Sequence, residues 1–388
     1  MKFLFPIALL ALLPCSPLSA QAAPNQLPLL APQEPLPEAL SGEESVKLLI
    51  SVDRGLAALQ KEQQEDGSFK TISYGQPAVT ALAVMAYLSR GHKPGQGPYG
   101  ESLEKAINYV LTKQKKSGLF SHTEIDYARL HEVPESGEDF DIMAAQTYNH
   151  AISMLMLGEV YGLMSEKEDF RLREAITKGL TCTIQLWDIR KKDATDDGGF
   201  RYTRPWEDGA EADVSITGWH AASLRSIRNA GFDVPQRVID RLVGYLTRNQ
   251  HADGGFGYRA RSNSRFTMTA AGTLCVALAG KHDDPALARA AAYLYRFDVN
   301  SYWAFADSSQ RNWPYYSCYY MTQAAIQLGG GVWVKCMRQC YTYLIQKQDP
   351  SGYWMPDGTD ASYGKAYSTS MAIIALTPPL QLLPIYQR

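Results

Sequence analysis

The chain has 388 residues, of which 45% are hydrophobic and 20% are charged, and its formal net charge is −2. This length and composition suffice for one large domain or two small ones with a substantial core. The near-neutral balance, with no basic run, gives no electrostatic basis for binding nucleic acid or an anionic membrane surface, so we expect no nucleic-acid partner.

The first 22 residues have the features of a signal peptide. Lys2 supplies the positive charge, residues 3–13 form a short apolar run, and Ala20-Gln21-Ala22 fits a cleavage site. Cleavage after Ala22 predicts export to the periplasm or to the outside of the cell. The alternative is a lipoprotein anchored at Cys15, which the adjacent Pro14 disfavours. No later run is apolar over the length a membrane helix needs, so we expect no transmembrane segment.

Residues 23–44 are predicted to be a linker, because a proline recurs every few residues without helical periodicity. The remaining residues, 45–388, are predicted to form the folded domain. Five cysteines follow the signal peptide. An odd number in an exported chain argues against a disulfide framework and favours buried thiols.

A motif of Gln, Gly and an aromatic residue recurs through this domain. Gln63, Gln114, Gln250 and Gln348 are each followed by a glycine four residues later and by Phe or Trp six residues later. A copy at Gln185 is interrupted by a charged insert, and the copy at residue 298 has Asp in place of Gln. Six copies of one unit indicate a repeat architecture.

Each copy predicts a helix with one polar face before the Gln and a nearly all-apolar helix after the aromatic residue. In chain order the predicted pairs are 46–62 with 77–91, 101–115 with 146–163, 169–187 with 213–230, 235–250 with 266–280, 285–297 with 314–329, and 333–348 with 366–377. No alternating β-branched run suggests a sheet. The predicted fold is therefore all-α: an α/α toroid of six helical hairpins, with an inner and an outer ring.

The Gln-x3-Gly-x-aromatic repeat resembles the QW motif of squalene–hopene and oxidosqualene cyclases, within the wider prenyltransferase/squalene-oxidase repeat family. In the cyclases, an Asp-x-Asp-Asp motif opens an inner helix and its middle acid protonates the substrate. The segment DVSITGW, residues 213–219, resembles that motif in placement. Asp213 matches the first acid, but Ser215 and Ile216 replace the other two, and a serine hydroxyl cannot protonate an alkene.

The protein prenyltransferases of the same family hold zinc with an Asp-x-Cys pair and a later His. Here Ser215 stands in place of the Cys and Tyr316 in place of the His. Because two of the three ligands are lost, we predict no metal and no other cofactor.

Asp213 is the candidate catalytic residue, and its structural alternative is the N-cap of a helix. The candidate ligand-binding residues lie on inner helices, and their structural alternative is packing between those helices. They are Tyr148, His150, Ser215, Trp219, His220, Trp313, Tyr316 and Tyr319.

The main prediction is an exported, cyclase-like protein that binds an apolar or isoprenoid-like ligand in its central cavity without the usual catalysis. One alternative is an active terpenoid cyclase or transferase that uses Asp213. Another is a glycan-acting toroid that uses paired loop carboxylates. The candidate acids are Glu124, Asp126, Asp139, Asp141, Asp197, Glu211 and Asp213. A protein-interaction scaffold with an unknown partner is the last alternative.

Overall fold

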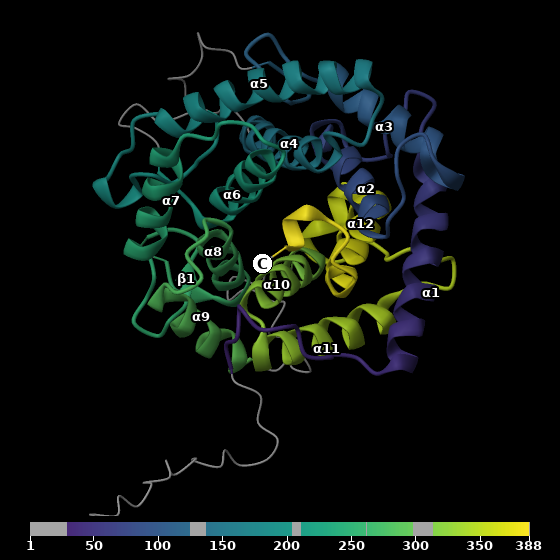
Figure 1. The fold of residues 1–388 in the computed structure, drawn as a ribbon. Helices are drawn as coiled ribbons and strands as arrows, with labels where there is room; N and C mark the ends of the chain where they lie inside the picture. The colour runs from purple at the N-terminus through teal and green to yellow at the C-terminus, as the bar shows by residue number, and fades with distance from the viewer. Residues whose placement is uncertain (1–28, 125–136, 204–210, 261, 298–312, 388) are drawn as a thin grey trace, which may run out of the picture.

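The computed structural model describes residues 29–124, 137–203, 211–260, 262–297 and 313–387. The side chains of residues 137–141 and 360 are not described. Two concentric rings of helices make up the fold (Figure 1). The outer helices are α1 Gly42–Leu59, α3 Gly100–Thr112, α5 Glu166–Asp188, α7 Gln236–Arg248, α9 Pro285–Tyr295 and α11 Gly330–Lys347. The inner helices are α2 Ala78–Ser89, α4 Gly137–Val160, α6 Val214–Asn229, α8 Phe266–Leu278, α10 Pro314–Leu328 and α12 Gly364–Leu376.

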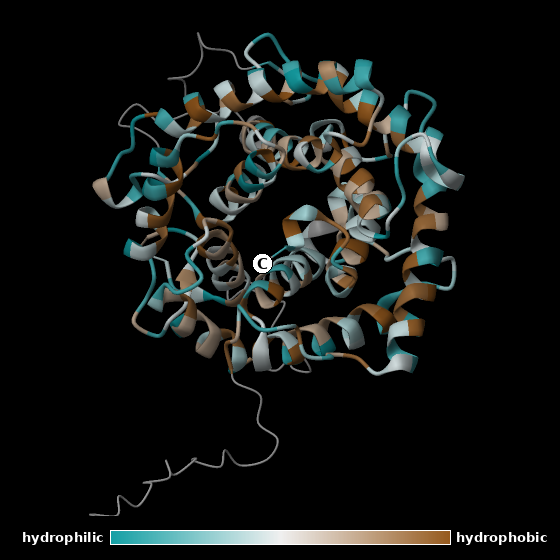
Figure 2. Ribbon diagram, in the orientation of Figure 1, coloured by the Kyte–Doolittle hydropathy of each residue, from teal (hydrophilic) through white to brown (hydrophobic). Residues whose placement is uncertain are grey.

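The inner ring is closed, because each inner helix packs on the next and α12 packs back on α2. This confirms the predicted toroid. The burial pattern follows the two helix types. In α7, one face is buried, through Val238, Leu242 and Leu246, and the other is exposed, whereas all twelve residues of α2 are buried. Figure 2 shows hydrophilic residues along the outer helices and the connecting loops. In the described part of the chain, strand structure is limited to the short pair β1 Phe256–Gly257 and β2 Ser264–Arg265.

The repeated glutamine joins neighbouring outer helices. Gln114 Nε2 donates to the Gly118 carbonyl oxygen at 3.2 Å and to the Ala175 carbonyl oxygen on α5 at 2.7 Å. Gln63 and Gln250 make the same pair of bonds to their own glycine and to the next outer helix. The side-chain amide therefore satisfies backbone carbonyls on both sides of each junction.

The same bond closes the ring between its last and first units. Gln348 Nε2 donates to the Gly352 oxygen at 2.9 Å and to the Ser51 oxygen on α1 at 2.8 Å. The Ser51 hydroxyl returns a bond to Gln348 Oε1 at 2.7 Å. The seam of the toroid is thus built like its internal junctions.

The aromatic residue of the repeat is held by the following inner helix. The backbone N–H groups of Phe69, Phe200, Phe256 and Trp354 each donate to a threonine hydroxyl on that helix at 2.9–3.1 Å. In the second unit, His150 replaces the threonine, and its Nδ1 accepts from Phe120 N–H at 3.1 Å.

The N-terminal segment differs from the predicted linker. Residues 29–41 lie along α11, where Leu29 O accepts from Val332 N–H at 3.2 Å and Pro37 O accepts from Trp333 Nε1 at 3.0 Å. Helix α1 begins at Gly42, before the predicted start, because Ser41 and Glu44 form a reciprocal capping box. The described part of the predicted linker is therefore a docked strap. Helix α4 also begins earlier than predicted, at Gly137 rather than residue 146.

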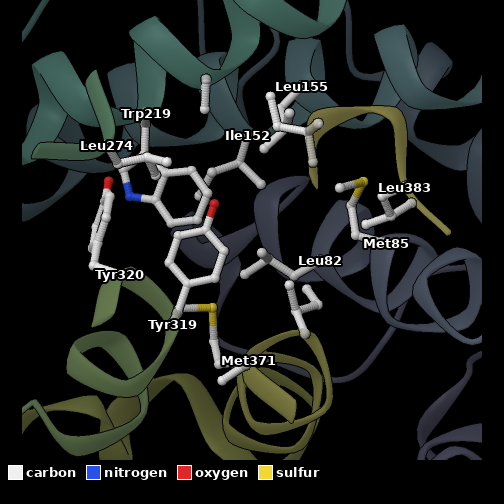
Figure 3. Packing of buried hydrophobic residues seen from close by; sticks show 14 of the residues in the cluster. Leu82, Met85, Ile152, Leu155, Trp219, Leu274, Tyr319, Tyr320, Met371 and Leu383 are labelled. Carbon is white, nitrogen blue, oxygen red and sulfur yellow. The ribbon is translucent and has the colours of Figure 1, made fainter. Parts of the chain in front are cut away.

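The last residues fill one end of the central channel. Leu383 is 2% exposed and lies beside Met85 of α2 (Figure 3). The Tyr386 hydroxyl donates to the Ile374 oxygen at 3.2 Å, and Ile385 N–H donates to Glu159 Oε2 at 3.2 Å. Burial raises the pKa of Glu159 to about 7, against the lowering effect of its bonds from Ser226 and Ile385. We call residues 383–386 the C-terminal plug.

Candidate functional site

A cavity of about 810 Å³ lies at the other end of the channel, near the N-terminal ends of the inner helices. All six inner helices contribute to its wall. Their lining residues include Val79 and Leu82 of α2, Tyr148 and Ile152 of α4, Ser215 and Trp219 of α6, Met268 of α8, Tyr316 of α10 and Tyr367 of α12. A volume of this size fits a small organic molecule.

The wall of the cavity is mostly aromatic and apolar. Its aromatic residues are Tyr74, Tyr148, Tyr202, Trp219, Tyr258, Phe266, Trp313, Tyr316, Tyr363 and Tyr367. Three arginines, Arg201, Arg259 and Arg265, lie at the wall as well. Among the described residues that line the cavity, none is an Asp or a Glu.

A chain of hydroxyl groups crosses the wall between three inner helices. Ser215 Oγ lies 2.7 Å from the Tyr148 hydroxyl and 2.6 Å from the Tyr316 hydroxyl. Trp219 Nε1 donates to the Tyr316 oxygen at 3.2 Å. Four of the residues predicted to contact a ligand are therefore gathered in one network. Burial raises the pKa of both Tyr148 and Tyr316, so both phenols stay protonated at neutral pH.

Asp213 does not line the cavity itself, but it is bonded to two wall residues, Arg201 and Tyr258. It is fully buried, caps α6 by accepting from Ile216 N–H at 2.9 Å, and pairs with Arg201. Its carboxylate also accepts from the Tyr258 hydroxyl at 3.2 Å. Burial alone lowers the pKa of Arg201, but Asp213 and Tyr258 outweigh this effect and the pKa is raised. Both oxygens of Asp213 are therefore engaged by protein donors, as a helix cap and as the partner of a buried arginine.

The two candidate histidines are not among the residues that line the cavity. His150 accepts from Phe120 N–H and contacts the Thr183 hydroxyl at 2.9 Å. The His220 ring stacks on Phe200 with 3.9 Å between the ring centroids. Burial lowers the pKa of His150 to about 3 and that of His220 well below its usual range. Both histidines stay neutral and pack inner helices against the aromatic residues of the repeat.

The remaining aromatic candidates divide between wall and support. Trp313 lines the cavity, with its ring centroid 6.3 Å from that of Tyr316. Tyr319 is not among the lining residues; its ring stacks on Trp219 at 4.8 Å between centroids (Figure 3). Tyr319 therefore supports the ring of Trp219 without lining the cavity itself.

The described loop carboxylates do not line the cavity, and each is bonded to another protein group. Asp197 pairs with Arg241, Glu211 pairs with Arg259 at 2.5 Å, and Glu124 accepts from Ser117 Oγ at 2.7 Å. Asp126 and the side chains of Asp139 and Asp141 lie outside the described residues. The described part of the chain thus holds no facing pair of carboxylates across the cavity, the arrangement that glycoside hydrolysis requires.

The residues at the zinc position of the prenyltransferases do not fit a zinc ion. Asp213 is occupied by Arg201, and the Ser215 hydroxyl is bonded to two tyrosines. Across the described ranges, no three His, Cys, Asp or Glu side chains gather in a way that could hold a metal. All five described cysteines are buried free thiols.

Arg201, Tyr202 and Tyr258 are among the wall residues that were not candidates from the sequence. Tyr202 and Tyr258 hydroxyls lie 2.9 Å apart, and Arg201 donates to the Tyr258 oxygen at 3.1 Å. A signal for the tyrosines exists, because each stands two residues after the aromatic residue of its repeat, Phe200 or Phe256. In extended chain, that spacing puts both side chains on the same face.

Solved structures with the same fold include the type II terpene cyclase MstE from Scytonema. A variant of MstE in complex with geranylgeranyl dihydroxybenzoate, its substrate, aligns with a TM-score of 0.56 and 14% identity, over 89% of this chain and 100% of that one. A glycosidase variant aligns with a TM-score of 0.54 and 13% identity over the same shares, and another was solved with glucose. At these identities the likeness shows the fold alone. No protein-family model matches the chain, and no curated protein matches its sequence.

Proposed function

We propose that this terpene-cyclase-like toroid binds an apolar, isoprenoid-like molecule in its cavity without cyclase chemistry. One observation carries the proposal: the described wall is mostly aromatic and apolar and contains no carboxylic acid. Aromatic faces and aliphatic side chains favour an apolar ligand through burial of its surface. The structure of MstE with a geranylgeranyl substrate supports an isoprenoid class of ligand on this fold.

The contacts of Asp213 support binding rather than catalysis. A cyclase acid must be held protonated in an apolar site. Asp213 is not among the residues that line the cavity, and its oxygens are taken up by Ile216 N–H, Tyr258 and Arg201. The proposal therefore assigns Asp213 a structural role beside the cavity.

Extraction and titration test this proposal. Organic extraction of the purified protein, followed by mass spectrometry, is expected to release an isoprenoid-like compound. A 20-carbon isoprenoid alcohol should then bind the extracted protein with about 1:1 stoichiometry in calorimetry. Ala144→Trp, which places a large ring at the cavity wall, should abolish this binding, whereas Val46→Trp on the exposed face of α1 should not.

Two results would overturn the proposal. Equal affinity of wild type and Ala144→Trp would place any binding outside the cavity. Turnover of a polyprenyl substrate that disappears in Asp213→Asn, while Ser165→Ala at the cap of α5 retains it, would make the protein an enzyme.

We also propose that the protein is exported. The support is the charged, then apolar, then small-residue pattern of residues 1–22, which lie outside the described residues. Within the described part of the chain, no helix has the length and hydropathy to span a membrane. N-terminal sequencing of the mature protein, after fractionation, should start at Ala23; an intact Met1 terminus inside the cell would contradict export.

A further inference from the structure

We infer that the cavity selects an apolar molecule carrying one oxygen function, a hydroxyl or a carbonyl, and that the linked hydroxyls of Tyr148, Ser215 and Tyr316 recognise it. This inference rests on the proposed function, because it concerns the ligand of the same cavity. It names the chemical class of that ligand more closely than the aromatic wall alone can.

A count of protons shows what the hydroxyl chain offers a ligand. The three hydroxyls carry three protons, and the two bonds through Ser215 Oγ use two of them. If the chain runs from Tyr148 to Tyr316, the proton of Tyr316 is left over; if it runs the other way, the proton of Tyr148 is left over. If both phenols donate to Ser215 Oγ, the serine proton is left over. One hydroxyl donor therefore remains in every arrangement, on a residue that lines the cavity.

The surroundings fix this chain in place. Trp219 Nε1 donates to the Tyr316 oxygen at 3.2 Å, and the Tyr320 hydroxyl donates to the Ser215 backbone oxygen at 3.4 Å. Trp219 is itself held between the rings of Tyr319 and Tyr320 (Figure 3). Because both tyrosines of the chain remain protonated, the leftover group is a neutral donor, which suits a neutral oxygen acceptor.

The rest of the cavity supplies the apolar contacts that orient such a ligand. Val79, Leu82 and Ile152 line it from α2 and α4, and Phe266 and Met268 line it from the start of α8. A hydrocarbon that displaced water from this site would leave the leftover hydroxyl donor without a partner. An alcohol or an aldehyde would satisfy it, so the oxygenated ligand should bind more tightly.

The test compares three probes of equal chain length: a 20-carbon isoprenoid alcohol, its aldehyde, and the hydrocarbon without oxygen. Equilibrium competition in cyclodextrin solution gives their relative affinities. For the wild type we expect the alcohol and the aldehyde to bind about tenfold more tightly than the hydrocarbon, or more. Equal affinities for all three would overturn the inference and leave the proposed function standing; no binding of any probe would overturn the proposed function itself.

The variants follow from the proton count. Tyr316→Phe and Tyr148→Phe should each keep most of the preference, because the remaining tyrosine and Ser215 share one bond and still have one proton left over. The triple variant Tyr148→Phe/Ser215→Ala/Tyr316→Phe removes every hydroxyl of the chain. It should lose the preference while still binding the hydrocarbon, which also shows that its cavity is intact. Tyr109→Phe, on outer helix α3, is the matched control and should change nothing. A triple variant that keeps the tenfold preference would overturn the inference; if the triple variant does not fold, the wild-type comparison alone decides.

Discussion

The two ends of the channel are built from the same six inner helices but differ in what occupies them. At the N-terminal ends of these helices, a cavity of about 810 Å³ is lined by phenol and indole rings. At the opposite end, Leu383 and Tyr386 of the C-terminal plug are buried among the helices. A closed ring of helices encloses space along its axis. In this protein the C-terminal plug fills that space at one end, and the cavity remains at the other.

We expect the plug end of the channel to contribute mainly to stability and the cavity end mainly to ligand binding. The plug contributes buried apolar surface and hydrogen bonds to the fold, whereas the cavity leaves its rings available to a ligand. Substitutions in the plug should therefore reduce the free energy of unfolding, and conservative substitutions in the wall should alter affinity instead. Four variants test how completely the two roles divide.

Tyr386→Ala should have the largest effect on stability. Removing a buried aromatic ring typically costs about 3–5 kcal/mol, because the cavity left behind does not collapse fully. Urea unfolding measures this loss. Tyr386→Phe, which removes only the bonds to Ile374 O and Thr377 Oγ1, should cost about 1 kcal/mol. A loss below about 1 kcal/mol for Tyr386→Ala would show that the plug does not hold this end together.

Asp213→Ala should reduce the free energy of unfolding although Asp213 lies at the cavity end of the channel. It leaves Arg201 buried without its carboxylate, and losing one partner of a buried pair costs about 3–5 kcal/mol. Adding Arg201→Met removes the uncompensated cation and should recover part of that loss. If thermal unfolding shows Asp213→Ala to be as stable as the wild type, the carboxylate is not the structural residue that its contacts indicate.

Glu159 should make the filled end sensitive to pH. In the unfolded chain its pKa is near 4.5, and in the folded protein it is about 7, so the folded state binds the extra proton between these values. The contribution of Glu159 to the free energy of unfolding is therefore greatest below pH 4.5 and falls as pH rises through 7, by on the order of 3 kcal/mol. The titratable groups that face Glu159, Tyr319 and Tyr386, have raised pKa values because of burial and stay neutral.

Unfolding at pH 4.5, 6 and 8 measures this dependence, and the difference between variants isolates it. Glu159→Gln should flatten the fall, whereas Glu166→Gln on the exposed face of α5 should reproduce the wild-type profile. Parallel profiles for the wild type and Glu159→Gln would contradict a protonated Glu159 in the folded protein.

Gln114→Ala should have the smallest effect. It removes two donated bonds, to Gly118 O and Ala175 O, and should cost about 1–2 kcal/mol. The affinity for an apolar probe should stay within about twofold of wild type, since Gln114 does not line the cavity. A much larger change in affinity would show that the outer junctions set the shape of the wall.

The repeat pattern was sufficient to predict the toroid, because its residues form the junction between two neighbouring outer helices. The glutamine, the glycine and the aromatic residue all act within one junction, so their spacing survives in the sequence. Gly118, for example, has φ 92° and packs against the backbone of Lys178, a place that a side chain would not fit. The plug could not be predicted this way, because residues 378–387 carry no repeat and are placed only by contacts with distant helices.

The candidate site was predictable in part for the same reason. Tyr148, Ser215, Trp219 and Tyr316 lie early on inner helices or on the inward face, and the repeat located those helices. His150 and Thr80 play the same role, since each accepts a bond from the backbone N–H of the repeat's aromatic residue. The sequence does not reveal this equivalence, because His150 follows Phe120 by 30 residues whereas Thr80 follows Phe69 by 11. Loops of different length disguise equivalent positions when only one sequence is compared with itself.

The bonds of Gln348, which join the last outer helix to the first, affect how this protein unfolds. Linear repeat arrays fray from their ends and need specialised terminal repeats. Here the first and last outer helices are joined by the same amide bonds as the others, across 297 residues rather than the 61 that separate Gln114 from Ala175. Closing that longer loop costs only about 1.4 kcal/mol more in chain entropy. The ring accordingly has no terminal unit from which to unravel, and amide hydrogens in its first and last units should exchange as slowly as those in the middle.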